Sequence, residues 1–351
     1  MRLWGIIWFP LDCLMALFLR RDGIQLGIIK LDKLGDFVLI LPYIHAQPYP
    51  PILIVTDYVE PFARLLCPQS MVVSIRLIPF YWNPVYRVRC LYRMRQLGIR
   101  TMVHPTPAWF RFLWDVSPLV RASGASHRIA FQSTEPIPWW ARVWTHFFGQ
   151  SPSEWVPAMG HDQQALFSLM PNKIVPNRRV VNELGPIVVA PLASAMGKSW
   201  PLEWMKIVIQ ELEKKGYLVL VVGLESDRSV LEELGVKNEQ LCLSVSGNAV
   251  TIVELLTKSR CMIACDNGLA HLAIYLGLPT VVVAGAGQWG RFFPYPDETN
   301  RSLSTLVSEV GCKGCNWACE YRVKGPTPCM AQVTPNQVLD QIYYFLGASH
   351  D

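Results

Sequence analysis

Two common nucleotide-binding signatures are missing from this sequence. No Gly-x-Gly-x-x-Gly follows the first predicted strand, and no Gly-x-x-x-x-Gly-Lys-Ser/Thr occurs. Their absence counts against the dehydrogenase and P-loop classes. Charged residues are also few, at 17% of 351 residues, and the sequence contains neither a low-complexity tract nor an internal repeat. With 51% hydrophobic residues, this composition excludes a disordered or fibrous protein and suffices for two hydrophobic cores.

The charges that are present are unevenly distributed. Residues 1–178 contain 18 Lys and Arg against 10 Asp and Glu, whereas the remainder contains 14 against 17. Nine of the 13 tryptophans also precede residue 160. A basic and aromatic N-terminal half favours an anionic partner, such as a phospholipid surface, a phosphorylated glycolipid or nucleic acid. The alternative is a solvated basic face above ordinary core tryptophans.

Residues 1–22 form an apolar N-terminal segment with only one acid, Asp12, between residues 3 and 19. The run is too short and too interrupted for an ordinary spanning helix, and no small-residue cleavage site follows it. We predict a helix lying in the membrane interface, with Trp4 and Trp8 as its anchors. Packing on the protein surface and true spanning are the alternatives.

Short apolar runs alternate with helix-like stretches along the rest of the chain. The predicted strands are 25–31, 52–56, 71–78, 100–104, 127–131, 187–190, 217–223, 241–245, 261–265 and 280–285. The predicted helices are 35–45, 57–66, 84–97, 107–121, 201–215, 226–234, 249–258 and 268–277. Such alternation predicts an α/β protein with doubly wound parallel sheets.

The change in pattern after an irregular stretch, 132–178, predicts a domain boundary. We expect one Rossmann-like domain at 23–178 and a second at 179–335, followed by a C-terminal helix within 336–351. Two such domains leave a cleft, and ligands of open α/β sheets bind beyond the carboxyl ends of the strands.

The first chemical motif is IIKLDKLGDFVLILP at residues 28–42. Gly35 permits a tight turn after a strand, and Asp36 opens an apolar helix where it can take a proton from a hydroxyl group. The competing interpretation is that Asp36 only caps the helix. Asp32 is a second carboxylate in the same turn and remains an alternative base.

Two further motifs follow strands of the second half. PLASAMGKSWP, residues 191–201, offers backbone amides and Lys198 to a diphosphate, although an exposed loop lysine is a common feature. VVGLESD, residues 221–227, places Glu225 just past a strand end, where an acid can bind ribose hydroxyls. An acid favoured by a helix dipole is the alternative for Glu225.

The fourth motif is CDNGLAHLAIYLGLPTVVVAG, residues 265–285. Asp266 and Asn267 form a turn, and Gly268 allows a ligand to approach the start of the next helix. Free amides at that helix end can bind a diphosphate. His271 lies in the first turn, where it can add a donor or serve a structural role.

The cysteines indicate a reducing compartment, because five of the ten stand in apolar runs and are expected to be buried thiols. Those residues are Cys67, Cys90, Cys242, Cys261 and Cys265. Four others cluster in a Cys-rich lobe at 311–330, namely Cys312, Cys315, Cys319 and Cys329. Four thiols can form a structural zinc site, two disulfides or a set of free thiols. No His or water-activating acid accompanies them, which argues against a catalytic zinc.

Taken in order, these motifs resemble glycosyltransferase family 9, the lipopolysaccharide heptosyltransferase family. The matching pieces are KLDKLGDFVLILP, APLASAMGKSWPLEWM, VVGLESD, CDNGLAHLAIYLGLPTVVVAG and the closing CKGCNWACEYRVKGPTPCMAQVTPNQVLDQI. The resemblance implies a GT-B fold with the donor in the C-terminal domain, and inversion at the anomeric carbon without a metal. The sequence also lacks the Asp-x-Asp pair with which metal-dependent sugar transferases hold their donor.

The resemblance places the family's proposed base at Asp36, its phosphate-binding lysine at Lys198, its ribose-binding acid near Glu225 and its donor loop at residues 266–271. It implies ADP-heptose as donor, a lipopolysaccharide core or related lipid-linked glycan as acceptor, and no required cofactor. We therefore expect a peripheral enzyme on the inner, cytoplasmic face of the membrane, bound to an anionic surface and not to nucleic acid.

The chain departs from the family pattern at Asn267, where Thr or Ser is usual, and in the loop GAGQWGRFFPYP at 285–296. Because of these departures, the resemblance does not determine which sugar the protein transfers. A non-catalytic glycan-binding or lipid-binding protein that retained the fold is the rival hypothesis.

Overall fold

The computed structural model describes two parallel α/β units. Described are residues 25–105, 116–131, 154–156, 184–193, 196–237, 241–243, 248–295, 303–315, 319, 321 and 326–347. The chain divides into one unit formed by 1–33 with 40–173, and a second formed by 34–39 with 174–351. The predicted N-terminal segment and the predicted boundary at residues 178 and 179 lie outside the described residues.

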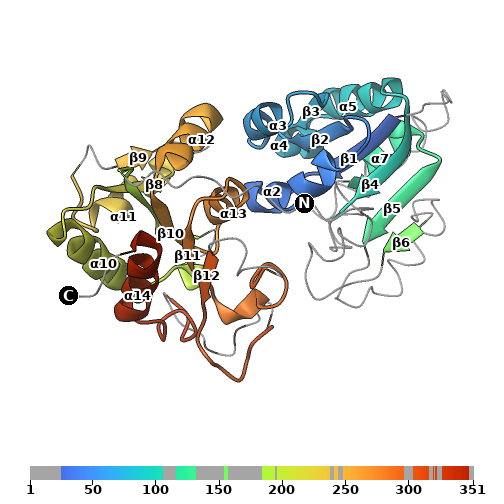
Figure 1. Cartoon of the computed structure of the whole chain (residues 1–351). Helices are drawn as coiled ribbons and strands as arrows, with labels where there is room; N and C mark the ends of the chain where they lie inside the picture. The colour runs from blue at the N-terminus through green and yellow to red at the C-terminus, as the bar shows by residue number, and fades with distance from the viewer. Residues whose placement is uncertain are drawn as a thin grey trace. The chain divides into compact units, whose positions relative to one another are not determined.

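The first unit is built on a six-stranded sheet in the order β3-β2-β1-β4-β5-β6 (Figure 1). All its strand pairs are parallel. Its strands are β1 (Gln25–Lys30), β2 (Ile52–Thr56), β3 (Val72–Ile75), β4 (Ile99–His104), β5 (His127–Phe131) and β6 (Glu154–Val156). Its helices are α3 (Glu60–Leu66), α4 (Leu77–Trp82), α5 (Pro84–Gln96) and α7 (Ser117–Ser123), and the helix α2 (Leu34–His45) belongs to it from Ile40 onward.

The second unit repeats this plan with the order β12-β11-β10-β7-β8-β9, again with parallel pairs. Its strands are β7 (Ile187–Ala190), β8 (Val219–Gly223), β9 (Leu241–Leu243), β10 (Cys261–Cys265), β11 (Thr280–Val283) and β12 (Leu303–Leu306). Its α-helices are α10 (Leu202–Lys214), α11 (Arg228–Glu232), α12 (Ala249–Lys258), α13 (Gly268–Tyr275) and α14 (Pro335–Leu346).

In both sheets the chain starts at a central strand and runs outward in two directions. The second strand of each unit pairs on one side of the first, and the fourth pairs on the other. This is the doubly wound order in which a ligand crevice forms at the point where the winding reverses. The reversal lies between β1 and β4 in the first unit, and between β7 and β10 in the second.

Burial explains why the central strands were visible in the sequence. The strand β10 is buried along its whole length, and so are β2 and β7. Strands buried on both faces read as continuous apolar runs. In the second unit, α10 and α14 pack over the sheet with the side chains of Met205, Leu212, Val338 and Ile342 in one core.

The structure corrects the prediction of a strand over residues 71–78. The strand β3 ends at Ile75, and α4 begins at Leu77. An apolar run of this length does not distinguish a strand from a short buried helix. Of the helix predicted over 107–121, only the last part is described as α-helix, within α7, and residues 106–115 lie outside the described residues. Among the residues that are described, no helix is both long and apolar enough to cross a membrane.

Candidate functional site

The turn after β1 contains a buried ion pair. The Nζ atom of Lys30 lies 3.0 Å from the Asp32 carboxylate, and it also donates a hydrogen bond to the carbonyl of Pro105 at 3.2 Å. Both side chains are buried. The lysine therefore joins the carboxyl ends of β1 and β4, on the two sides of the winding reversal. The Asp32 carboxylate is already held by a cation at this point.

Asp36 lies in the first turn of α2, and it is half-buried. The N-cap of this helix is Lys33, and no side chain caps it by hydrogen bonding. The interpretation of Asp36 as the cap residue was therefore wrong, because Asp36 is the third residue of the helix. A carboxylate in the first turn of a helix interacts favourably with the helix dipole.

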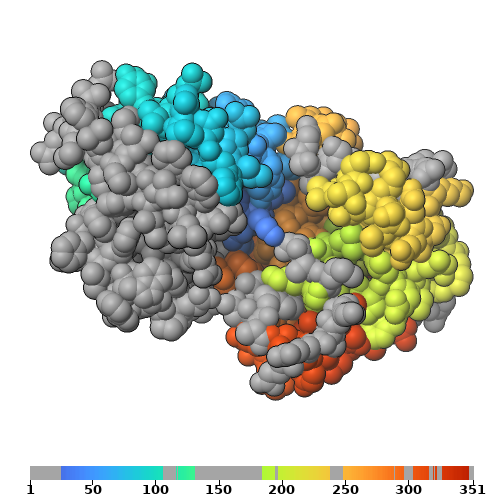
Figure 2. Space-filling model, turned by 180° about the vertical axis from the view of Figure 1, so that it is seen from behind, coloured from blue at the N-terminus to red at the C-terminus, as the bar shows by residue number. Residues whose placement is uncertain are grey.

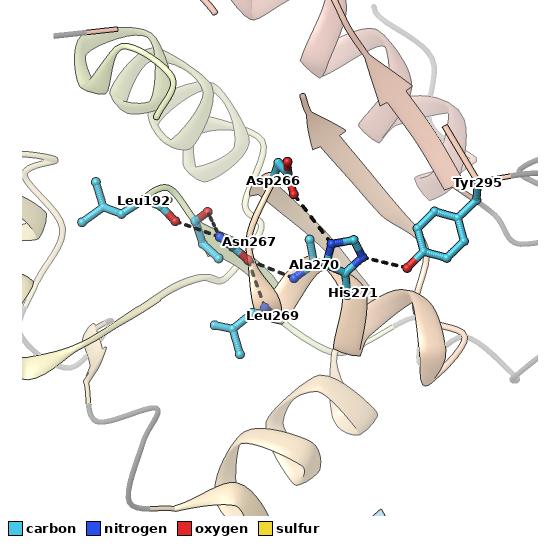
Figure 3. A network of polar contacts seen from close by, with 8 residues as sticks. Leu192, Asp266, Asn267, Leu269, Ala270, His271 and Tyr295 are labelled. Carbon is cyan, nitrogen blue, oxygen red and sulfur yellow. Dashed lines mark hydrogen bonds and ion pairs between the residues drawn. The ribbon is translucent and has the colours of Figure 1, made fainter. Parts of the chain in front are cut away.

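Asn267 ties two segments of the second unit together, as Figure 3 shows. Its Nδ2 group donates to the carbonyls of Ala190 at 3.1 Å and Leu192 at 2.9 Å. Its Oδ1 atom accepts from the amides of Leu269 and Ala270, both at 3.0 Å. One side chain thus caps α13 and holds the turn after β10 against the loop after β7, across the winding reversal of the second sheet.

The cap also changes what this helix end can offer a ligand. The amides of Leu269 and Ala270 are occupied by Asn267. The prediction that the first amides of this helix are free to bind a diphosphate was therefore wrong for Leu269 and Ala270. A Ser or Thr hydroxyl has a single donor, whereas the Asn amide has two. The departure from the family pattern at residue 267 therefore gives the loop after β7 a second anchor.

The loop that carries Lys198 is held at several further points. The Cys265 thiol donates to the carbonyl of Pro191 at 2.9 Å and accepts from the amide of Trp200 at 3.3 Å. The Thr327 hydroxyl donates to the carbonyl of Gly197 at 2.9 Å. Lys198 ends a short 3-10 turn, Met196–Lys198, and is half-buried. Its backbone is therefore fixed by hydrogen bonds on both sides.

His271 lies in the interior of the second unit, beside the turn after β10. Its Nδ1 atom is 2.7 Å from the Tyr295 hydroxyl, and its Nε2 atom is 3.6 Å from the Asp266 carboxylate (Figure 3). Its ring also stacks on Phe293, with the centroids 4.8 Å apart and the planes 15° apart. Both ring nitrogens of this buried side chain thus face polar groups of the protein.

Tyr295 and Phe293 are site residues that sequence reasoning missed. They belong to the segment FFPYP, more than twenty residues after His271. The only signal in the sequence was the density of aromatic residues in the departing loop at 285–296. Only the tertiary structure shows that these rings lie against His271.

Glu225 follows β8 in the 3-10 turn Glu225–Asp227, and its side chain is exposed. Arg228 donates two hydrogen bonds to its carboxylate, from Nε at 2.6 Å and from Nη2 at 3.2 Å. The hydrogen bond from Arg228 lowers the pKa of Glu225 below its usual value. The carboxylate is thus ionised at neutral pH and oriented by its neighbour.

The four clustered cysteines line a cavity of about 40 Å³ together with Thr327 and Tyr321. All four are free thiols, so the disulfide alternative does not describe this structure. Within the described part of the chain, no group of three or more His, Cys, Asp or Glu side chains is arranged to hold a metal ion. A structural zinc at these thiols stays a prediction of the sequence.

Comparison with known proteins bears on this arrangement directly. Residues 159–315 match the family model described as glycosyltransferase family 9 (heptosyltransferase). This part of the chain therefore carries a glycosyltransferase family 9 domain, the family that the motifs in its sequence resemble. The matched range includes the loop of Lys198, Glu225 and the turn at residues 266–271.

Solved structures confirm the GT-B fold. Heptosyltransferase II of E. coli, whose structure is titled an ADP-heptose lps heptosyltransferase, matches with a TM-score of 0.66 and 14% identity, over 92% of this chain and 98% of that one. A family 9 glycosyl transferase from Veillonella parvula matches with a TM-score of 0.69 and 12% identity, over 94% and 99%.

The E. coli heptosyltransferase WaaC with ADP matches with a TM-score of 0.65 and 14% identity, over 92% and 100%. At these identities, the structural likeness shows the two-domain fold. None of the curated protein sequences matches this chain.

Proposed function

We propose that this glycosyltransferase moves a heptose from ADP-heptose onto a lipopolysaccharide core or a related lipid-linked glycan. The observation that carries the proposal is the Asn267 junction, which joins the turn of Asp266 to the loop of Lys198. The junction lies at the winding reversal of the second sheet, where nucleotides bind in this class of fold. The names of two structural neighbours, which include ADP-heptose and ADP, support the choice of donor.

The proposed donor site uses groups of opposite character for the two ends of the donor. Lys198 supplies a cation on a fixed backbone and neutralises the diphosphate, with the positive end of α13 beside it. The amide of Gly268, ahead of the two occupied amides, completes this cradle. Glu225 accepts hydrogen bonds from the ribose hydroxyls, because an ionised carboxylate only accepts.

Asp266 is the proposed partner of the sugar. A carboxylate repels a diphosphate, but it accepts hydrogen bonds from sugar hydroxyls. His271 faces this carboxylate from the interior and acts on the donor through it.

The proposed reaction is a single displacement with inversion. A hydroxyl of the acceptor glycan attacks the anomeric carbon of the donor, the bond to the diphosphate breaks, and ADP leaves with the bonding electrons. Asp36 takes the proton of the attacking hydroxyl. Asp32 holds Lys30 and is not assigned this role. Cationic side chains and helix ends stabilise the leaving group, so the step requires no metal cofactor.

A lipid-linked acceptor requires the enzyme to work at a membrane. We therefore propose a peripheral location on the cytoplasmic face of the inner membrane, with residues 1–22 as one contact. The basic N-terminal half, with 18 Lys and Arg against 10 Asp and Glu up to residue 178, supports an anionic surface as partner.

Thermal unfolding in the presence of ADP, UDP, GDP and ADP-heptose tests the choice of donor. A ligand that binds only the folded state raises the unfolding temperature, so ADP and ADP-heptose are expected to do so. Stabilisation by UDP or GDP alone would contradict the proposed donor. If a glycolipid raised the unfolding temperature and none of these nucleotides did, the result would favour the non-catalytic alternative.

Two variants test the assigned roles separately. Asp36→Ala is expected to abolish transfer and to keep the stabilisation by ADP-heptose, with Asp57→Ala, directly after β2, as the control. Lys198→Ala is expected to weaken the binding of ADP, with Lys215→Ala, on the end of α10, as the control. Normal turnover in Asp36→Ala would remove the assignment of the base.

A further inference from the structure

A long stretch of the first unit contains no acidic residue. Between Glu60 and Asp115 the sequence has eight arginines and neither Asp nor Glu. The centre of this stretch forms α4 and α5, two consecutive helices separated only by Asn83. Asn83 caps α5 by accepting a hydrogen bond from the amide of Tyr86 at 3.0 Å. The two helices therefore follow each other directly in the chain, with one extended residue, Asn83, between them.

The inner face of this element is fixed in the core. Phe80 of α4 is buried, and Cys90, Leu91 and Met94 of α5 pack beside it against the sheet. The guanidinium of Arg87 lies 4.4 Å from the centroid of the Phe80 ring and donates to the Phe80 carbonyl at 3.3 Å. Arg87 therefore serves the packing of the two helices and is not available to a partner.

The outer face carries large apolar side chains in water. In α4, Ile78 is 75% exposed and Trp82 is 51% exposed. In α5, Val85 is 58% exposed and Tyr92 is 48% exposed. Positions 78 and 82 have the spacing of one face of α4, and positions 85, 89 and 92 have the spacing of one face of α5. Clustered exposed apolar groups of this kind mark interaction sites more often than scattered ones do.

Exposed arginines stand among these apolar groups. Arg89 lies on the same face of α5 as Val85 and Tyr92, and Arg93 lies one turn after Arg89; both are exposed. The nearest acid in the sequence before this stretch is Glu60. Its carboxylate accepts two hydrogen bonds from Arg64, at 2.9 Å and 2.7 Å. The Glu60 carboxylate also interacts electrostatically with Arg93. The face combines apolar area with the positive charge of two exposed arginines, and Glu60 offsets part of the charge of Arg93.

We propose that this face, the α4–α5 surface formed by Ile78, Trp82, Val85, Arg89, Tyr92 and Arg93, binds an anionic phospholipid bilayer. Figure 2 shows the segment that contains these helices, in blue-green, at the surface of the molecule. Arginine binds lipid phosphates, and Trp and Tyr rings favour the boundary between headgroups and acyl chains. The inference adds a second contact to the membrane association proposed above and rests on that association.

The aliphatic side chains decide between lipid and nucleic acid. Trp82 and Tyr92 can stack on bases as well as insert among lipids. Ile78 and Val85 have no ring to stack, and their transfer out of water is favourable only into an apolar phase. Helices that bind the interface of anionic membranes combine exposed apolar side chains with basic side chains. The exposed Ile78 and the arginines of α5 provide this combination.

Co-sedimentation of the full chain with vesicles tests the surface without any sugar donor or acceptor, so its result is separate from that of the transfer assay. The vesicles contain phosphatidylglycerol with phosphatidylethanolamine, or phosphatidylcholine alone. Ile78→Ser/Trp82→Ser is expected to lower the partition coefficient on anionic vesicles about tenfold or more, because two inserted side chains are lost. Arg89→Gln/Arg93→Gln is expected to lower it about fivefold for each arginine at low salt.

Matched controls come from the second unit. Tyr344 is 77% exposed on α14, and Lys214 is exposed on α10. Tyr344→Ser/Lys214→Gln is expected to bind vesicles as the unchanged chain does. Thermal unfolding of each variant verifies that the exposed substitutions leave the fold intact.

Three outcomes would overturn the proposal. One is unchanged binding of both α4–α5 variants to anionic vesicles, which would leave the membrane contact to residues 1–22 alone. Another is equal binding of the unchanged chain to neutral and anionic vesicles. The third is a change from dimer to monomer in Ile78→Ser/Trp82→Ser, seen by sedimentation velocity, with no change in vesicle binding. That result would make the surface an interface between copies of the chain.

Discussion

The hydroxyl oxygen of Tyr295 and the Nδ1 atom of His271 lie 2.7 Å apart in the interior of the second unit. The other ring nitrogen, Nε2, faces the Asp266 carboxylate at 3.6 Å. A carboxylate without a proton only accepts hydrogen bonds, so we expect a neutral ring to carry its proton on Nε2. Nδ1 is then the acceptor, and Tyr295 donates to it. The Tyr295 hydroxyl adds a second selection for this tautomer, besides the one that the Asp266 carboxylate makes.

Tyr295→Phe removes this selection and keeps the ring that packs in the site. We expect the ¹⁵N shifts of the His271 ring to change toward a mixture of tautomers, and the KM for the nucleotide sugar to rise more than kcat falls. Loss of one buried hydrogen bond costs about 1 kcal/mol of folding free energy. Tyr343→Phe, at another buried tyrosine of the same unit, is the control. Unchanged histidine shifts in Tyr295→Phe would show that the Tyr295 hydroxyl does not select the tautomer.

Asn267→Ala removes four hydrogen bonds from the junction between the loops after β7 and β10. At about 0.5–1.5 kcal/mol for each bond, we expect a loss of roughly 2–6 kcal/mol in the free energy of unfolding. Asn267→Asp keeps the helix cap and places a charged acceptor against two carbonyls, so it is expected to weaken the junction as well. Asn267→Ser restores the cap alone and is expected to recover part of the loss. Chemical denaturation monitors all three variants.

Much of the second unit could be predicted from its sequence, and the reason is burial. The strands β7 and β10 are buried on both faces, so their apolar runs coincide with their bounds. The strands at or beside the sheet edges were harder. The strand β12, LSTL, lies at an edge and is only partly buried, and β6, EWV, has three residues. Neither offers a periodic apolar pattern, and neither was predicted.

In the candidate site, too, some features could be predicted from the sequence and others could not. Asp266 and Asn267 could be found because they directly follow a recognisable strand and open a helix. The contact between Asn267 and Leu192 could not, because it joins residues 75 positions apart. The same holds for the carbonyl of Pro105, which Lys30 contacts across 75 positions. A single sequence indicates which residues form a local turn. It does not give the order of the strands in the sheet, and the contacts between distant segments depend on that order.

The pair of Lys30 and Asp32 predicts a non-additive response. Removing one partner of a buried ion pair leaves the other charge uncompensated, which costs about 3–5 kcal/mol. Lys30→Met and Asp32→Asn are therefore each expected to destabilise the first unit strongly. The double variant is expected to lose less free energy of unfolding than the two single variants lose together, because no buried charge remains in it. Additive losses in denaturant unfolding would show that the two side chains act independently.

The buried thiols differ from the clustered ones in their expected reactivity. Burial raises the pKa of the Cys67, Cys261 and Cys265 thiols to about 12. At pH 8 only about one in 10,000 of each is then the reactive thiolate. Iodoacetamide footprinting of the native protein, read by mass spectrometry, is expected to leave these three unmodified.

Cys312, Cys315 and Cys319 are partly exposed and are expected to react in the same footprinting experiment. Their behaviour also decides the state of the cluster, because a bound zinc would protect all three until a chelator is added. Reaction without a chelator would establish free thiols, as in this structure. Modification of Cys261 at the rate of Cys315 in the folded protein would contradict the assigned burial, since a thiol inside β10 can react only after the sheet has opened.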